Sequence, residues 1–191
     1  MSEPLALLGT SADPPTLGHQ VLLLQLLQRY PRVVTWASDN PSKQHGATLK
    51  QRSQLLAALV AQLNDPRLSH VQELSSPWAI TTLERAARLW PDTQLVFVVG
   101  SDLVDQIPGW KQVEQVLQRC RLALVPRAGW PLSPEAIAAL EQLGGQVSVL
   151  ELPIPATASS TLRLRPDPAQ IPTSVWPLLR EHNLYGLGAL S

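Results

Sequence analysis

Short apolar runs alternate with amphipathic segments along this chain. The apolar runs, which have the length and composition of strands, are Leu5–Leu8, Val33–Ala37, Leu68–Val71, Leu95–Val99, Leu122–Val125 and Val147–Leu150. The segments between them, which have helical periodicity, are Gly18–Arg29, Thr48–Leu63, Ile80–Trp90, Val113–Arg119 and Pro134–Leu143. Such alternation is typical of βαβ units, so it predicts an α/β fold with a doubly wound, mostly parallel sheet and helices on both faces.

The chain has no internal feature that divides it. No Gly/Ser-rich linker, composition shift or repeat interrupts the alternation, so we expect one domain over residues 1–191. The part from 153 to 191 changes character: a loop and a short helix from Ser160 are followed by the segments Ser174–His182 and Leu184–Gly186, and we expect terminal helices there. Helix ends are recognisable, as where Ser133 precedes a proline at the first helical position.

Composition excludes several classes of function. Fifteen basic and fifteen acidic residues balance, so no net charge favours nucleic acid or an anionic membrane surface as partner. The single cysteine, Cys120, excludes an internal disulfide and a cysteine-rich zinc site, and its apolar context predicts a buried thiol. No signal peptide or membrane-spanning run is recognisable, so we expect a cytoplasmic protein. Whether it forms a homo-oligomer stays open.

The segment that follows the first expected strand has the features of a phosphate site. Gly9, Thr10 and Ser11 begin a turn that continues through two prolines into a helix. His19 falls in the first turn of that helix, where unpaired backbone N–H groups and the helix dipole attract anions. Nucleotide chemistry is therefore the leading hypothesis.

Other reactive side chains follow other expected strands. The G-x-G-x-x-G and G-x-x-x-x-G-K-[ST] motifs are missing, so phosphate must bind to another kind of turn. Lys43 follows the second strand, and Gly100-Ser101-Asp102 follows the fourth. After the last strand, Ser159-Ser160-Thr161 leads to Arg163, which makes a second candidate phosphate site. Because ligands bind beyond the carboxyl ends of parallel strands, two such sites on one edge suit a polyphosphate.

Two of these segments together resemble a known family. Thr16-Leu17-Gly18-His19 and Ser159–Arg163 match the two signatures of the nucleotidyltransferase superfamily with the (H/T)-x-G-H motif, which implies a Rossmann-like fold. Within it, the chain is similar over nearly its whole length to bacterial nicotinate-nucleotide adenylyltransferases. The other matching blocks are Lys43, Arg52, Phe97–Asp102 with Pro108–Trp110, Leu124–Arg127 with Gly129, and His182–Tyr185.

The chain also departs from that branch. Thr16 stands where the nicotinate branch usually has histidine, and Trp78-Ala79 stands where it usually has Tyr-Thr. Ala12 and Ser42 replace a usual phenylalanine and histidine. These differences leave open an adenylyltransferase for phosphopantetheine or nicotinamide mononucleotide. A non-catalytic nucleotide-binding protein is a third alternative.

The resemblance implies transfer of the adenylyl group of ATP to nicotinate mononucleotide, which gives nicotinate adenine dinucleotide and pyrophosphate for NAD biosynthesis. It also implies Mg²⁺, held mainly by the ATP phosphates. The implied catalytic residues are His19, Thr16, Lys43 and Arg163, with His19 donating to the α-phosphate. The implied ATP-binding residues are Gly9, Thr10, Ser11, Gly18, His19, Gly100, Asp102, Ser159, Ser160, Thr161 and Arg163. No residue is expected to bind a metal directly.

The acceptor nucleotide has its own candidate residues. Trp110 is expected to stack on the pyridine ring, and Trp78, Arg52 and Arg127 are further candidates for the pyridine nucleotide. Each assignment has a simpler alternative: Thr16 and Asp102 could be helix caps, Trp110 could be a core residue, and Arg163 could be solvated. The remaining histidines, His45, His70 and His182, have no ligand-like spacing and are expected to be exposed.

Overall fold

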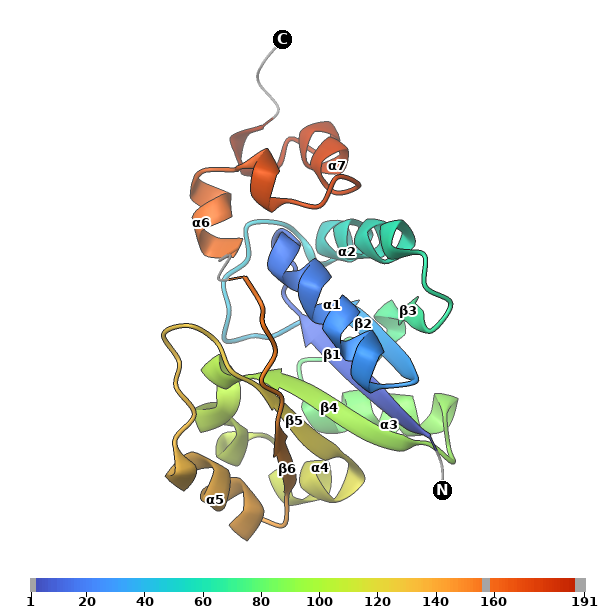
Figure 1. Cartoon of the computed structure of the whole chain (residues 1–191), viewed down its shortest axis with the longest axis vertical. Coiled ribbons are helices and arrows are strands. Elements are labelled where there is room, and N and C mark those ends of the chain that lie inside the picture. Colours follow the sequence, from blue (N-terminus) through green and yellow to red (C-terminus); the bar gives the residue numbers. More distant parts are fainter. Residues whose placement is uncertain (1–2, 156–158, 188–191) are drawn as a thin grey trace.

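A computed structural model of the chain describes residues 3–155 and 159–187. Six strands form one sheet in the order β3-β2-β1-β4-β5-β6, and each neighbouring pair is parallel (Figure 1). The strands are β1 Pro4–Thr10, β2 Arg32–Ala37, β3 Leu68–His70, β4 Gln94–Gly100, β5 Arg121–Val125 and β6 Gln146–Val149. The predicted doubly wound, Rossmann-like α/β fold is confirmed, and all the pairings between described strands are parallel.

The helices lie where the periodicity predicted them, with ends that differ by at most two residues. They are α1 Leu17–Arg29, α2 Leu49–Leu63, α3 Ala79–Leu89, α4 Val113–Arg119, α5 Pro134–Gln142, α6 Ser159–Leu164 and α7 Trp176–Glu181. The predicted cap of α5 is present, because Ser133 Oγ accepts a hydrogen bond from the Ala136 N–H. The segment after β4, for which no helical element was predicted, is a run of 3₁₀ turns, η2, over Ser101–Gly109. Three shorter 3₁₀ elements are η1 Gln72–Leu74, η3 Pro168–Gln170 and η4 Leu184–Gly186.

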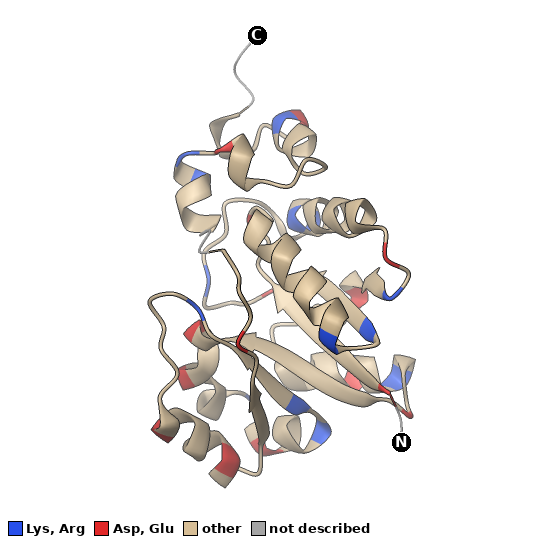
Figure 2. Cartoon of the chain, viewed as in Figure 1, with Lys and Arg blue, Asp and Glu red and all other residues tan. Residues whose placement is uncertain are grey.

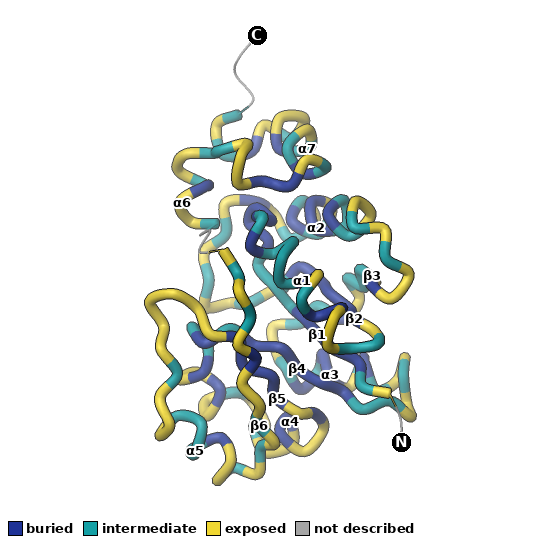
Figure 3. Tube along the Cα trace, in the orientation of Figure 1, coloured by how far each residue is buried: buried dark blue, intermediate teal, exposed yellow. Residues whose placement is uncertain are grey.

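The sheet separates two hydrophobic cores. Side chains alternate along β1, so that Ala6 and Leu8 join one core while Leu5 and Leu7 join the other. Helices α1, α2 and α7 pack on the first face, and α3, α4 and α5 pack on the second. Strands β1, β2, β4 and β5 are accordingly mostly buried, whereas β6, at the edge of the sheet, is largely exposed (Figure 3). This burial on both faces explains why the strands are continuous apolar runs.

The strand order places a crevice next to β1. The chain leaves β1 toward β2 and returns to β4 on its other side, and ligands of such sheets bind beyond the strand ends at this reversal. Helices α6 and α7 lie at that end of the molecule, beside α1 and α2 (Figure 1). Leu162, Val175 and Leu179 of this C-terminal part belong to the same core as α1. The second signature is thereby brought to the end of β1.

Basic and acidic residues are interspersed along the ribbon rather than gathered on one element (Figure 2). Basic and acidic residues are mixed there, in agreement with the balanced composition. Among the described residues, the helices are too short or too polar to cross a membrane.

Candidate functional site

A cavity of about 1100 Å³ lies at the carboxyl ends of the strands. Both signature segments contribute to its wall, together with the loops that follow β2, β4 and β5. The predicted site residues in its lining are Gly9, Thr10, Ser11, Thr16, Gly18, His19, Lys43, Trp78, Gly100, Asp102, Trp110, Arg127, Ser159, Ser160 and Arg163. The fold therefore brings together, at one cavity, nearly all the residues that the sequence singled out. Two predicted residues, Arg52 and Thr161, are not in the lining.

His19 is held in one orientation by hydrogen bonds to both of its ring nitrogens. The backbone N–H of Thr16, the N-cap residue of α1, donates to His19 Nδ1 over 3.1 Å. Thr16 Oγ1 lies 3.0 Å from the same nitrogen, and Thr10 Oγ1 lies 2.9 Å from Nε2. Because Nδ1 accepts from a backbone N–H, the proton of the neutral ring is on Nε2. The ring thus presents an N–H donor at the end of β1.

The surroundings of His19 keep the ring neutral. Burial, and then the charges of Arg127 and Lys43, lower the pKa of His19 from 6.5 to about 4. The imidazole is therefore uncharged at neutral pH and acts as a hydrogen-bond donor through Nε2. His19 also takes part in the capping box of α1, but its bond to Thr10 joins it to another element, β1.

Asp102 is placed between two cations from two other loops. Its Oδ2 lies 3.4 Å from Lys43 Nζ, and its Oδ1 lies 3.1 Å from Arg127 Nη1. Burial alone would raise the pKa of Asp102, but the charges of Arg127 and Lys43 outweigh it and hold that pKa below its ordinary value. Asp102 is not the cap of η2, because Gly100 takes that position. A β-carbon on Gly100 would lie 2.5 Å from Asp102 Oδ1, so this close approach requires glycine.

A buried carboxylate that the sequence analysis did not single out lies behind the cavity. Asp13 is 0% exposed, and its carboxylate accepts hydrogen bonds from the backbone N–H groups of Gly46 and Ala47, at 2.6 and 3.1 Å. The hydroxyl of Tyr185, in η4, donates to the same group. Burial and the hydrogen bond to Asp13 raise the pKa of Tyr185 well above its ordinary value, so it remains a donor. Asp13 therefore connects the first signature to the loop before α2 and to the C-terminal part.

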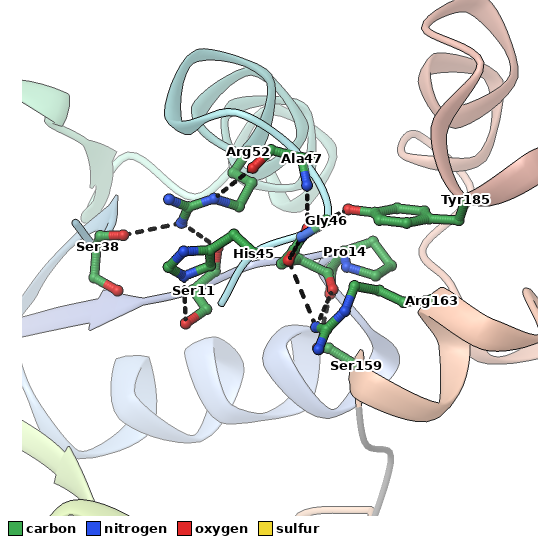
Figure 4. Close-up of polar contacts among 11 residues, drawn as sticks. Ser11, Pro14, Ser38, His45, Gly46, Ala47, Arg52, Ser159, Arg163 and Tyr185 are labelled. Atoms are coloured by element: carbon green, nitrogen blue, oxygen red, sulfur yellow. Dashed lines mark hydrogen bonds and ion pairs between the residues drawn. The ribbon is translucent and has the colours of Figure 1, made fainter. Parts of the chain in front are cut away.

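The same aspartate positions Arg163 of the second signature. Arg163 Nη1 donates to the backbone carbonyl of Asp13 over 3.0 Å and lies 3.5 Å from its Oδ2 (Figure 4). Ser159 Oγ donates to the carbonyl of Pro14 over 2.9 Å. These bonds join segments 145 and 150 residues apart in the chain. Arg163 is thus fixed against the first signature rather than extended into solvent.

Arg52 has a different place from the one that the resemblance implied. It is 2% exposed, and its guanidinium donates to the backbone carbonyls of Ser11, Ser38 and Ala47, at 2.8, 2.9 and 3.3 Å (Figure 4). Arg52 itself is not in the cavity lining, and its three hydrogen bonds fix the loops after β1 and β2, so the described contacts give it a structural place rather than the expected one at the acceptor.

Thr161 is also corrected. It is exposed on α6, whereas Ser159, Ser160 and Arg163 of the same signature are in the lining. Successive positions on a helix point in different directions, and Thr161 is on the side away from the cavity. The second signature therefore supplies two hydroxyls and one guanidinium, not three hydroxyls.

Four aromatic side chains form another part of the cavity wall, which we call the aromatic end: Trp36, Trp78, Phe97 and Trp110. Trp36 stacks on Phe97 with ring centroids 6.3 Å apart, and the rings of Phe97 and Trp110 form a T-shaped pair with centroids 6.1 Å apart. Trp78 is 47% exposed, and the ammonium of Lys111 lies 5.4 Å from the centroid of its ring. Trp110 therefore both packs on another ring and faces the cavity. Neither Trp36 nor Phe97 was predicted as a site residue; Trp36 lies next to the end of β2, but Phe97 lies in the middle of β4, where no local signal indicates a site.

The histidines outside the signature are less exposed than expected. His45 is partly buried in the cavity wall, where its Nε2 lies 3.3 Å from Ser11 Oγ, and His70 Nε2 lies 3.3 Å from Ser53 Oγ. His182 is also partly buried. Cys120, in contrast, is buried as predicted, and burial raises the pKa of its thiol to about 12.

Comparison with known proteins places this site in context. The sequence matches the Cytidylyltransferase-like family over residues 7–165. It is 35% identical to a protein of Synechocystis sp. named probable nicotinate-nucleotide adenylyltransferase, over 95% of this chain and 98% of that one. A protein of the same name from Chlorobium phaeobacteroides is 31% identical, over the same shares of the two chains.

Solved structures share the fold. The nicotinic acid mononucleotide adenylyltransferase of Plasmodium falciparum, complexed with NaAD, superposes with a TM-score of 0.74 at 16% identity. The superposition covers 98% of this chain and 100% of that one. A second structure of the same enzyme, complexed with APC, has a TM-score of 0.72. At this identity, the likeness establishes the fold.

Proposed function

Because this chain belongs to the cytidylyltransferase-like family, and within it to the nicotinate-nucleotide adenylyltransferases, we propose that it joins ATP to nicotinate mononucleotide. The products are nicotinate adenine dinucleotide and pyrophosphate, and the reaction belongs to NAD biosynthesis. One observation carries this proposal beyond the family: two signature segments 145 residues apart in the chain face the same cavity. A generic nucleotide-binding turn would need only the first of them.

In this reaction, the phosphate of the mononucleotide attacks the α-phosphorus of ATP. A bond forms from that phosphate oxygen to the α-phosphorus, and the bond from the α-phosphorus to the bridging oxygen of the β-phosphate breaks. The attacking phosphate is already an anion near neutral pH, so no side chain must remove a proton. The protein therefore acts by alignment and by stabilising negative charge.

His19 is the residue that we assign to the α-phosphate. Its Nε2–H, which donates toward Thr10 Oγ1 in this structure, would donate instead to an α-phosphate oxygen. A neutral ring suits this task, because it keeps a donor there with no change of protonation during the reaction. Thr16 acts indirectly, through the backbone N–H that fixes the tautomer.

The other polar residues of the cavity have roles along the nucleotide. Arg163, fixed by Asp13, and Ser160 would bind the β- and γ-phosphates. Asp102 would accept hydrogen bonds from a ribose, and its partners Lys43 and Arg127 would face phosphate oxygens. The indole of Trp110 would stack on the pyridine ring.

The residues present fit a divalent cation only if the substrate carries it. Among the described residues, no group of three or more His, Cys, Asp or Glu side chains could hold a metal. Asp102 is the one carboxylate among the described lining residues, and it is paired with two cations. We therefore propose Mg²⁺ bound to the ATP phosphates and water, where it would neutralise phosphate charge. The cytoplasm, where ATP is plentiful, is the location we propose.

A related acceptor remains the second candidate. Trp78 and Ala79, where the family usually has Tyr-Thr, both line the cavity. This difference favours a changed acceptor as the second candidate. Phosphopantetheine and nicotinamide mononucleotide are the acceptors to compare. A non-catalytic protein is the third candidate, although both signatures are intact and assembled.

One assay separates these candidates. Pyrophosphate release is measured from ATP and Mg²⁺ with nicotinate mononucleotide, nicotinamide mononucleotide or phosphopantetheine as acceptor. Selective turnover of nicotinate mononucleotide supports the proposal. Preference for another acceptor replaces it with the second candidate, and no release with any acceptor leaves the non-catalytic one.

A further inference from the structure

The cations of the cavity differ in how they are paired. The lysines and arginines in its lining are Lys43, Lys111, Arg127 and Arg163. Three of them have a carboxylate partner: Lys43 and Arg127 pair with Asp102, and Arg163 pairs with Asp13. Lys111 has no ion pair within the described part of the chain, and its ammonium lies over the ring of Trp78 instead. Among the lysines and arginines of the described lining, Lys111 is therefore the one that is not paired with a carboxylate of the protein.

The position of Lys111 indicates which part of a ligand it would meet. Lys111 directly follows Trp110, which forms a T-shaped pair with Phe97, and its ammonium reaches the ring of Trp78. Its ammonium is therefore at the aromatic end of the cavity. Arg163 and Ser159 of the second signature lie elsewhere in the wall, where they donate to backbone carbonyls of the segment that leads into the first signature. Asp102 is the sole carboxylate in the described lining, and it forms ion pairs with Lys43 and Arg127. The described lining therefore holds no further carboxylate that could pair with Lys111.

We propose that Lys111 is a specificity-determining residue that binds the ring carboxylate of the acceptor, while Trp78 and Trp110 contact the pyridine ring. This inference rests on the proposed function and deepens it. Nicotinate carries a carboxylate with full negative charge at neutral pH, whereas nicotinamide carries a neutral amide at the same place. An ammonium gains a charge-assisted hydrogen bond from the first and much less from the second. Lys111 thus gives the cavity a means to favour the acid form.

The chain offers a matched control for this lysine. Its three lysines are Lys43, Lys50 and Lys111, and Lys50 is exposed on α2, outside the cavity lining. Lys111→Met and Lys50→Met make the same chemical change at the two sites. For each variant, kcat/KM is measured with nicotinate mononucleotide and with nicotinamide mononucleotide, and the ratio of the two is compared with that of the unmodified chain.

We expect Lys111→Met to lower this ratio about ten-fold, through a higher KM for nicotinate mononucleotide and with the KM for ATP unchanged. Lys50→Met should leave the ratio unchanged. Lys111→Arg, which keeps the charge, should recover most of the selectivity. A lysine that only supports the fold would lower both values of kcat/KM together, without changing their ratio.

The outcomes separate this inference from the function on which it rests. If the unmodified chain prefers nicotinate mononucleotide and Lys111→Met retains that preference, the role of Lys111 is wrong and the proposed function stands. Equal losses with both acceptors also overturn the role. If the unmodified chain does not use nicotinate mononucleotide, the proposed function and the role of Lys111 fail together.

Discussion

The backbone N–H of Thr16 donates a hydrogen bond to Nδ1 of His19 over 3.1 Å. This bond makes Nδ1 an acceptor, so the single proton of the neutral ring lies on Nε2, toward the cavity. The donor is a backbone group, which any residue except proline supplies at that position. Thr16 stands where the nicotinate branch usually has histidine, and this difference therefore leaves the orientation of His19 unchanged.

His19→Ala removes the donor that we assign to the α-phosphate. We expect kcat to fall about 100- to 1,000-fold with little change in the KM for ATP, because the bond strengthens as charge develops in the transition state. Pyrophosphate release under saturating ATP measures the effect. A variant with more than about a tenth of the original kcat would contradict the assignment.

Thr16→Ala tests whether the backbone or the hydroxyl of Thr16 fixes the ring. The variant keeps the N–H that donates to Nδ1 and loses only the hydroxyl 3.0 Å from it. We expect kcat to fall less than about ten-fold, which corresponds to the loss of one hydrogen bond between uncharged groups. A fall as large as that of His19→Ala would show that the hydroxyl itself is required.

Stability should decrease as the pH falls below 6.5. Burial is the largest cause that lowers the pKa of His19, to about 4, and burial also lowers the pKa values of His45 and His70. Between pH 6.5 and about 4, the unfolded chain binds protons that the folded chain does not, so the free energy of unfolding declines in this window. Denaturant unfolding at pH 7 and pH 4.5 measures the change.

A matched variant assigns part of that change to one ring. His19→Gln should make the free energy of unfolding less dependent on pH between 6.5 and 4.5, and NMR titration should place the transition of His19 near pH 4. A His19 signal that titrates near 6.5 would refute the environment described for this ring.

Tyr185→Phe removes one donor from the buried carboxylate of Asp13. We expect the free energy of unfolding to fall by about 1.5 kcal/mol or more, because the lost bond is to a charged group. The other tyrosine of the chain, Tyr30, provides the control, and Tyr30→Phe should cost less than about 0.5 kcal/mol. Urea denaturation of both variants gives the comparison, and equal losses would argue against the role of Tyr185.

Gly9→Ala tests the close approach of β1 to the aromatic end. The new β-carbon would lie 2.8 Å from two ring atoms of Trp36, which is 2% exposed and stacked on Phe97. We expect a loss of about 1–3 kcal/mol, because a packed ring has little room to move. At Gly109 a β-carbon would meet no heavy atom within 4 Å, so Gly109→Ala should be nearly neutral. Indistinguishable midpoints in urea would contradict this geometry.

The sequence was sufficient for the architecture. Alternating apolar runs and helical segments predicted each strand and helix to within two residues, because buried strands and amphipathic helices have different local periodicities. It also predicted that His19 and Arg163 would lie at the same edge of the sheet, where both line one cavity, because each follows a strand whose carboxyl end lies at that edge.

Asp13, Arg52 and Lys111 could not be interpreted from the sequence alone. The partners of Asp13 lie 33, 150 and 172 residues away, and an aspartate before a proline has no local mark that distinguishes a buried acceptor from a turn residue. The roles of Arg52 and Lys111 also have no mark in the sequence. The structure shows that Arg52 donates to backbone carbonyls, whereas Lys111 lies over an indole ring and has no carboxylate partner among the described residues.

Local pattern thus determined the elements of this protein and the edge of the sheet where its chemistry belongs. Only the tertiary structure decided which charges are neutralised within the protein and which remain for a substrate. The physical reason is that periodicity depends on neighbours a few residues away, whereas the pairing of a charged side chain depends on groups that distant loops bring to it.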